Sequence, residues 1–203
     1  PELFGSKAQN ILKSTDGILI LACGTSYHAG LVARYWLESV AGITCNVEIA
    51  SEYRYRDPAS RPNTLAVGIS QSGETADTIA ALNYAKSLGN IHSLAICNVA
   101  ESTIVRQADL CFLTRAGPEI GVASTKAFIG QMLVLYILAI KISEVRKEIS
   151  KSDYEKKIND LKRLPDLIKK TLNYCQNNIP IIAKDFLKAK GSMFLGRGLS
   201  FPI

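Results

Sequence analysis

The run Ile18-Leu-Ile-Leu-Ala-Cys23 is apolar at every position and passes directly into Gly24-Thr25-Ser26 and a helical pattern from about Tyr27 to Val40. A strand that is apolar on both faces and leads into an amphipathic helix is typical of a parallel sheet covered by helices on both sides. Similar apolar runs recur along the chain and predict four more strands, at 46–50, 65–69, 93–97 and 110–113. Helical patterns follow the third of the five strands, through about Ser87, and the fifth, from about Ser124 into 141–147.

This alternation predicts an α/β fold. Right-handed crossovers would arrange it as a three-layer αβα sandwich with a five-stranded, mostly parallel sheet of the flavodoxin-like kind. A C-terminal helical segment should follow, broken at Leu164-Pro165, with a further short helix over 179–190. The run Ser192-Met-Phe-Leu195 predicts a fresh buried strand. We therefore expect three regions: a first α/β domain (1–147), a helical connecting segment (148–190) and the start of a second α/β domain (191–203).

The composition excludes several classes of protein. The 203 residues are 47% hydrophobic, which excludes a disordered or fibrous chain. Residues 1–140 carry 10 basic and 11 acidic side chains, whereas 141–190 carry 13 and 7, so the net charge of +6 arises in the late helical segment. That segment lacks interleaved aromatic residues, so a solvated helical face is expected rather than a nucleic-acid surface. The longest apolar stretch, Ala127 to Ile140, is too short to span a bilayer, so no membrane association is expected.

The cysteines indicate the compartment. There are five, without a C-x-x-C pair, and no export signal opens the chain. We therefore expect reduced, mostly buried thiols and a cytoplasmic protein. Neither His28 nor His92 has partners at metal-ligand spacing, so no metal site is expected. Cys23, at the end of an apolar strand, is expected to pack in the core rather than act as a nucleophile. Because residue 1 is proline, we expect the chain to be a piece of a longer polypeptide.

Two strand-to-helix turns are rich in hydroxyl groups. Ser70-Gln-Ser-Gly-Glu-Thr75 places three hydroxyls and an amide before a helix, and Thr25-Ser26 follows the first strand. Ligands of open parallel sheets bind at such turns, and the positive end of a helix favours an anion there. The Walker and dinucleotide patterns are absent, and neither turn contains a lysine or arginine. The turns thus predict a hydroxyl-lined site for a small phosphate monoester.

A structural explanation stands beside this one. Serine and threonine before a helix are also ordinary N-caps, although capping needs only one or two of the hydroxyls in the hexapeptide. Glu74 is either a general base or, as we favour, an acidic residue placed to interact with a helix dipole. The stretch Glu119-Ile-Gly-Val-Ala-Ser-Thr-Lys126 combines a glycine, two hydroxyls and another helix start, and is expected to form a wall of the same pocket. Lys126 is expected to face solvent.

Six sequence runs together resemble the sugar isomerase (SIS) family. They are Leu21-Ala-Cys-Gly-Thr-Ser-Tyr27, Glu48-Ile-Ala-Ser-Glu52, Ser70-Gln-Ser-Gly-Glu-Thr-Ala-Asp77, Ala95-Ile-Cys-Asn98, Glu119-Ile-Gly-Val-Ala-Ser-Thr-Lys-Ala127 and Phe194-Leu-Gly-Arg-Gly198. The hexapeptide marks only the family, whereas the longer run from Glu119 resembles the members that transfer nitrogen from glutamine to fructose 6-phosphate. The resemblance implies an aminotransferase of amino-sugar biosynthesis that forms glucosamine 6-phosphate, works as a homodimer and carries a glutaminase domain.

The resemblance also assigns the binding residues, and no cofactor or metal among them. Phosphate would be held by Ser26, Ser70, Gln71, Ser72 and Thr75, and the sugar by Thr25, Val122 and Ser124. It further implies that the glutaminase cysteine, the isomerase general base and the ring-opening lysine lie outside these residues. We therefore expect no catalytic residue in this chain, and binding without turnover.

Three alternatives remain open at this point. The first is the sugar-phosphate sensor domain of a transcription regulator, which a preceding helix-turn-helix would favour. The second is a stand-alone aldose–ketose phosphate isomerase, for which His28 is the nearest candidate catalytic residue. His28 is instead expected to be a partly exposed surface side chain. The third is a structural dimerisation domain, which would not need so many polar positions in one loop.

Overall fold

The computed structural model describes residues 3–59, 61–89, 92–121 and 124–203. It divides into two compact units, one comprising the residues up to Glu148 together with Pro202 and Ile203, the other running from Ile149 to Phe201. All predicted site residues that the structure describes lie in the first unit.

The first unit is built on a five-stranded sheet in which every pair of neighbours is parallel. The strand order is β2-β1-β3-β4-β5, so the predicted α/β class is confirmed. The strands are β1 (Gly17–Ala22), β2 (Thr44–Ile49), β3 (Thr64–Ser70), β4 (His92–Cys97) and β5 (Leu110–Leu113). Each lies within two residues of its predicted position.

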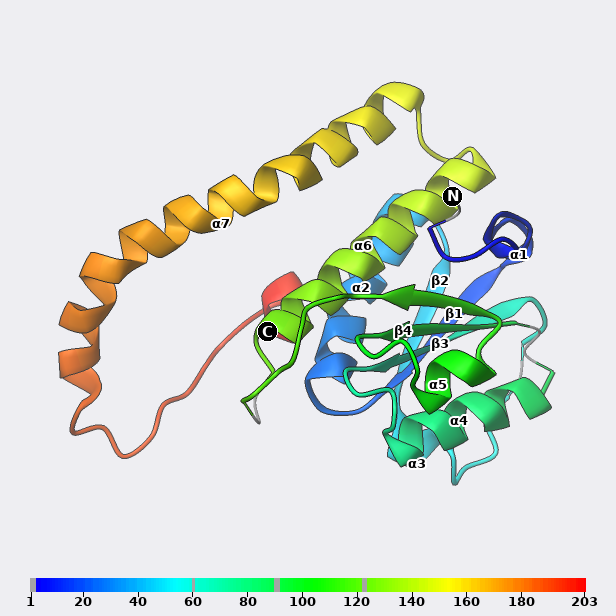
Figure 1. Ribbon diagram of the computed structural model, residues 1–203, viewed down its shortest axis with the longest axis horizontal. Helices are drawn as coiled ribbons and strands as arrows, with labels where there is room; N and C mark the ends of the chain where they lie inside the picture. Colours follow the sequence, from blue (N-terminus) through cyan, green and yellow to red (C-terminus); the bar gives the residue numbers. More distant parts are fainter. Residues whose placement is uncertain (1–2, 60, 90–91, 122–123) are drawn as a thin grey trace. The chain divides into compact units, whose positions relative to one another are not determined.

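Helices cover both faces of this sheet (Figure 1). One face packs against α1 (Ala8–Ser14), α2 (Gly24–Ala41) and α6 (Lys126–Arg146). The other packs against α3 (Ala50–Tyr53), α4 (Ala76–Ser87) and α5 (Thr103–Gln107). The short helices α1, α3 and α5 were not predicted from the sequence. The helix after β1 begins at Gly24, so Thr25 and Ser26 lie in its first turn rather than before it.

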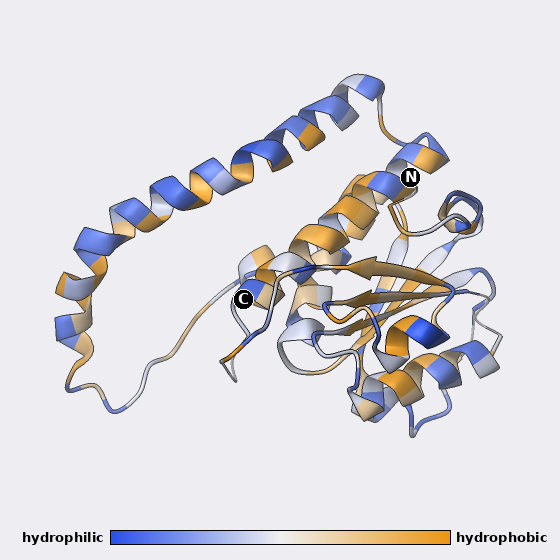
Figure 2. Ribbon diagram, in the orientation of Figure 1, coloured by the Kyte–Doolittle hydropathy of each residue, from blue (hydrophilic) through white to orange (hydrophobic). Residues whose placement is uncertain are grey.

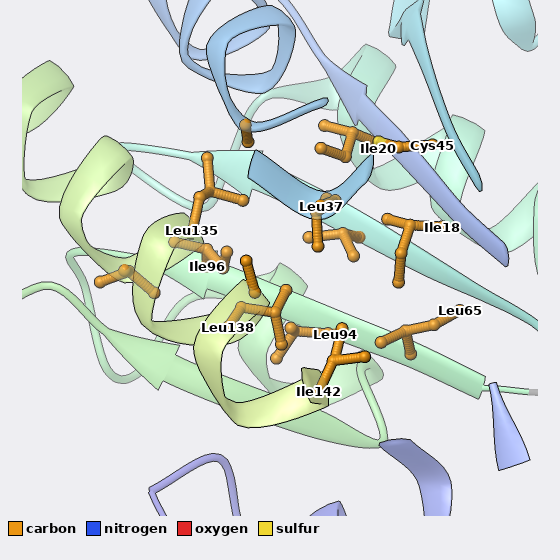
Figure 3. Packing of buried hydrophobic residues seen from close by; sticks show 14 of the residues in the cluster. Ile18, Ile20, Leu37, Cys45, Leu65, Leu94, Ile96, Leu135, Leu138 and Ile142 are labelled. Carbon is orange, nitrogen blue, oxygen red and sulfur yellow. The ribbon is translucent and has the colours of Figure 1, made fainter. Parts of the chain in front are cut away.

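The larger core lies between the sheet and α2 and α6. Figure 3 shows Leu135, Leu138 and Ile142 of α6 among the sheet residues Leu94 and Ile96, and all five are fully buried. Figure 2 shows hydrophobic residues along the strands and much of α6, as expected for elements enclosed by other layers.

The helix α6 is longer than the apolar run predicted. Its 21 residues make it long and apolar enough, by length and composition alone, to cross a membrane. Residues such as Val134, Leu135 and Leu138 nevertheless contribute to the core of the first unit. The buried core helix of a compact domain passes the same test, and this side of α6 is buried in that way.

The second unit differs from the prediction in three respects. The helix α7 (Lys151–Phe186) continues through Pro165 and Pro180, so the predicted break at Leu164-Pro165 and the predicted separate short helix over 179–190 are both wrong. The helix has no buried residue, and water can hydrogen-bond to the carbonyls that the prolines leave without a donor. The predicted strand at Ser192–Leu195 is also wrong, since these residues are exposed and irregular before a 3₁₀ turn at Gly198–Ser200. A strand without a neighbour leaves its backbone groups unpaired.

A glycine sets how closely α2 approaches the sheet. A Cβ at Gly30 would lie 2.9 Å from Ile20 Cγ2 and 2.9 Å from Val47 Cγ1, whereas a Cβ at Gly130 of α6 would have only ordinary contacts, the nearest at 3.8 Å. We predict that Gly30→Ala lowers the free energy of unfolding by about 1–3 kcal/mol through overpacking. Gly130→Ala, the matched control, should raise it by about 0.5–1 kcal/mol through helix propensity. Urea denaturation tests both; equal effects of the two substitutions would contradict the close approach of α2.

A second prediction concerns Asp109, which precedes β5. Burial raises its pKa, but the Ser93 N–H and Ser93 Oγ–H, which donate to Oδ2 over 2.8 and 2.7 Å, together with Lys86 at 3.5 Å, outweigh burial and leave the pKa below its ordinary value. A depressed folded-state pKa stabilises the fold above the unfolded-state pKa of about 3.9, and this stability is lost as pH falls through the folded-state pKa.

Asp109→Asn should therefore destabilise the protein at pH 7 by about 1 kcal/mol, a value reduced for the partial exposure of the carboxylate. The difference from the unsubstituted protein should shrink as the pH is lowered below about 4. Asp57→Asn, at an exposed carboxylate, serves as the control. Denaturation at several pH values measures this, and a difference that does not change with pH would count against the stated cause.

Candidate functional site

The carboxyl ends of β1 and β3 form the edge at which the predicted site lies. The strand β1 pairs with β2 on one side and with β3 on the other. The connection from β1 leads to β2, and the next connection leads back past β1 to β3, so the direction of the crossovers reverses at β1. Such a switch point is where ligands of open α/β sheets bind. The turns after these two strands are the hydroxyl-rich turns that the sequence singled out.

The turn after β3, Ser70–Thr75, forms a closed loop that we call the cradle loop. The Gly73 N–H donates to Ser70 Oγ over 2.9 Å, and the hydroxyls of Ser70 and Thr75 are paired at 2.9 Å. The Glu74 N–H donates to Ser72 Oγ over 3.2 Å. Ser70 is buried, Thr75 half-buried and Ser72 exposed, so Ser70 supports the loop from within while Ser72 is open to solvent.

The hydroxyls of these turns do not cap the helices that follow them. The residue at the cap position of α2 is Cys23 and that of α4 is Thr75, and neither side chain accepts a hydrogen bond from its helix. Both helices thus begin at the site with first-turn N–H groups that lack intrahelical acceptors. The structure therefore removes the capping explanation for Thr75 and for Thr25 and Ser26, which lie within the first turn of α2.

Gly73 allows the cradle loop to pack against α5. Its φ of 70° lies in the left-handed region, and a Cβ at this position would lie 2.1 Å from Ser102 Oγ and 2.7 Å from Cys97 Sγ. The Gly73 carbonyl accepts a hydrogen bond from the Ile104 N–H over 3.1 Å. No other residue type fits both the backbone angle and the space.

Glu74 fastens the loop at a second point. Its Oε1 accepts from the Thr103 N–H over 2.7 Å, and this hydrogen bond lowers the pKa of the Glu74 carboxyl. The predicted role at a helix dipole is therefore modified: Glu74 interacts with the N-terminus of α5, whereas the acidic residue in the first turn of α4 is Asp77. Asp77 in turn pairs with Arg54, at 2.8 Å.

Asn98 joins the cradle loop to the segment after β5. Its N–H donates to the Gln71 carbonyl over 3.2 Å, its Oδ1 accepts from the Thr114 hydroxyl and the Ala116 N–H, and its Nδ2 donates to the Gly117 carbonyl over 2.8 Å. Asn98 thus fixes two loops at neighbouring strand ends, one through its backbone N–H and the other through its side-chain amide.

A shallow hollow of about 610 Å³ opens between these two loops. Its lining residues, here called the hollow residues, are Gln71, Asn98, Val99, Arg115, Gly117, Pro118 and Glu119. Gln71 is the predicted phosphate ligand among them. The sequence analysis does not include Arg115, because it lies outside the two hydroxyl-rich turns. The signal available in the sequence is its place two residues after the end of the fifth strand.

The other predicted residues occupy the same edge of the sheet. Thr25 is exposed and Ser26 buried at the start of α2, and Ser124 is half-buried just before α6. Val122 lies outside the described residues. Within the described part of the chain, the hydrogen bonds of the cradle loop do not reach Thr25, Ser26 or Ser124.

The remaining ionisable groups near the site are either exposed or engaged elsewhere. Glu119 Oε2 accepts from the Ala127 N–H at the start of α6 over 3.0 Å. His28 and Lys126 are exposed, as predicted. Among residues 3–59, 61–89, 92–121 and 124–203 no three His, Cys, Asp or Glu side chains cluster as metal ligands would.

The thiols show no sign of activation. Cys97 is buried behind the cradle loop, and half-buried Cys23 packs against the core, as expected. Burial raises the pKa of Cys45 to about 12, which keeps this thiol protonated.

Comparison with known proteins agrees with this geometry. The chain is 50% identical over 203 residues to glutamine–fructose-6-phosphate aminotransferase (isomerizing) of Bordetella parapertussis, and 50% identical over 202 residues to that of Pseudomonas aeruginosa. It covers 33% of the length of each of these relatives. The solved C-terminal domain of glucosamine-fructose-6-phosphate aminotransferase from Francisella tularensis superimposes with a TM-score of 0.95 at 43% identity, covering 98% of this chain and 56% of that one.

A family model described as SIS domain matches residues 11–141, which include the sheet, the cradle loop and the start of α6. This model covers more than half of the chain and includes the whole parallel sheet, so the chain belongs to the SIS domain family.

Proposed function

We propose that this chain is the sugar-phosphate-binding SIS unit of a glutamine–fructose-6-phosphate aminotransferase, and that it binds fructose 6-phosphate and glucosamine 6-phosphate. The chain spans about a third of the length of the relatives of that name that it matches. The reaction of such an enzyme, transfer of the glutamine amide nitrogen to fructose 6-phosphate, therefore belongs to the whole protein.

The observation that carries the proposal is the unused donor capacity of the cradle loop. Ser72 Oγ accepts the Glu74 N–H, so its own proton is free for an acceptor outside the loop. In the Ser70–Thr75 pair, donation by Ser70 leaves the half-buried Thr75 hydroxyl able to donate outward. A phosphate oxygen placed there would receive charge-assisted hydrogen bonds, each contributing about 1.5–3 kcal/mol.

Two helix N-termini add to this donor set. The helices α2 and α4 both begin at the switch point, and the positive end of a helix stabilises an anion. We assign Ser26, Ser70, Gln71, Ser72 and Thr75 to the phosphate, with Ser70 acting through Thr75. We assign Thr25 and Ser124 to the sugar, together with Val122.

The described residues support binding better than proton transfer. A general base needs a carboxylate or imidazole within reach of substrate. Glu74 and Glu119 are hydrogen-bonded to the N-termini of α5 and α6, and His28 is exposed on α2. We therefore propose that the base, the ring-opening lysine and the glutaminase belong to other parts of the enzyme.

The wider organisation belongs to the same proposal. Residues 1–147 would form a first SIS domain, 148–190 a helical connection, and 191–203 the start of a second SIS domain. Met193, Phe194 and Leu195 are exposed apolar side chains that a second domain would bury. The enzyme would be a cytoplasmic homodimer that needs no cofactor.

The binding site is tested by removing one hydroxyl. Ser72→Ala should weaken fructose 6-phosphate binding about tenfold, or about 1.4 kcal/mol, because a donor to the phosphate is lost. Ser39→Ala is the matched control, since the Ser39 hydroxyl donates to the Tyr35 carbonyl of the same helix, α2. Isothermal titration measures both variants, and indistinguishable affinities would argue against the cradle.

The division between binding and catalysis is tested by assay of the chain alone. We expect the 203 residues to bind fructose 6-phosphate yet release no glucosamine 6-phosphate when supplied with ammonia. Chromatographic detection of product over hours provides the measurement, with the full-length Pseudomonas aeruginosa relative as the positive control. Product formation by the chain would show that a residue of this chain supplies the base.

A further inference from the structure

We infer that Arg115 is an additional phosphate-binding residue, which supplies the cationic charge that the cradle loop lacks. This inference rests on the proposed function, because it takes the phosphate monoester of the same site as its ligand. It adds a residue that neither the hydroxyl-rich turns nor the sequence resemblance includes.

Arg115 and Gln71 line the same hollow, and Gln71 belongs to the cradle loop. The volume of about 610 Å³ leaves room for a hexose phosphate, since small-molecule sites commonly occupy 300–1,000 Å³. Of the residues assigned to the phosphate, Gln71 lines this hollow, so a phosphate that contacts Gln71 would lie in the pocket that Arg115 also lines.

Arg115 has a φ of 51°, a left-handed conformation that an arginine rarely adopts and that favours glycine or asparagine. The residues on either side are both bound to Asn98 Oδ1, by the Thr114 hydroxyl at 3.1 Å and the Ala116 N–H at 2.7 Å. The same asparagine holds the Gln71 carbonyl. An uncommon conformation is thus fixed in register with the cradle loop, as is typical of residues that serve a site.

Among the residues the structure describes, no carboxylate lies within ion-pair distance of Arg115. Glu119 is the acidic residue among the hollow residues, and its carboxylate accepts a hydrogen bond from the Ala127 N–H rather than pairing with Arg115. Arg115 is exposed, so its attraction for a dianion should be moderate and sensitive to salt. A planar guanidinium is also the side chain best suited to a phosphate.

The test compares Arg115→Asn with Arg61→Asn. Asparagine tolerates the left-handed backbone, so Arg115→Asn removes the charge without adding strain. Arg61 is exposed in the segment that precedes β3, at the opposite end of the strand from the cradle loop, and provides an equal change of charge. Affinities for fructose 6-phosphate and for inorganic phosphate are measured by isothermal titration at about 20 mM and about 500 mM salt, with thermal melting of every variant.

We expect Arg115→Asn to weaken both ligands about fivefold at low salt and less than about twofold at high salt, with an unchanged or higher melting temperature. Arg61→Asn should leave both affinities within about twofold at either salt concentration. Unchanged affinity of Arg115→Asn at low salt would overturn the inference. So would a loss of the same size for Arg61→Asn, which would show a general effect of net charge.

A second variant covers a failure to fold. If Arg115→Asn melts at a lower temperature, Arg115→Gly replaces it, because glycine adopts the left-handed backbone most readily. Full affinity in a folded glycine variant would equally overturn the inference. The proposed function is judged separately by Ser72→Ala. Weakened binding in that variant with normal binding in Arg115→Asn would reject only the role of Arg115, whereas normal binding in both would reject the phosphate site itself.

Discussion

The close packing of Gly73 against the start of α5 is the constraint on which the site depends. Because this residue has no Cβ, the loop can approach Ser102 and Cys97, and its left-handed backbone directs the N–H at Ser70 Oγ while the carbonyl accepts from Ile104. The hydroxyls of the loop are then held in place before any ligand arrives. Preorganised donors of this kind avoid part of the entropic cost of ordering a loop upon binding.

The polar groups around the site divide into those that support and those that remain available. Ser70, Glu74, Asn98 and Glu119 all accept hydrogen bonds from backbone N–H groups of the site or of the helices beside it. Among the described residues, the groups that remain available are hydroxyls, helix N-termini and the Arg115 guanidinium, all of them donors. A site rich in donors, whose carboxylates already accept backbone N–H groups, is suited to hold an anion and poorly suited to remove a proton from carbon. This division supports a binding unit whose chemistry is completed by other parts of the enzyme.

The sequence predicted the sheet well because strands buried on both faces are apolar at nearly every position, as in Ile18–Cys23. It also located the cradle loop, since hydroxyls and a glycine stand directly between a strand and a helix. It failed where the outcome depends on tertiary contacts: α5 is five residues long and is held by contacts with the cradle loop. The predicted break at Pro165 is wrong because, in an exposed helix, water can hydrogen-bond to the carbonyl that the proline leaves without a donor. Arg115 is not predicted as a site residue, because only folding brings it to the same hollow as Gln71.

The most direct measurement is the mapping of backbone amide shifts by NMR during titration with fructose 6-phosphate and, separately, with unphosphorylated fructose. We predict that fructose 6-phosphate changes the chemical shifts of the backbone amides in the cradle loop and in the first turn of α2. Fructose at the same concentration should leave these chemical shifts unchanged. Equal shifts with both ligands, or shifts confined to residues away from these turns, would contradict the claim that hydroxyl and N–H dipoles at the switch point recognise the phosphate.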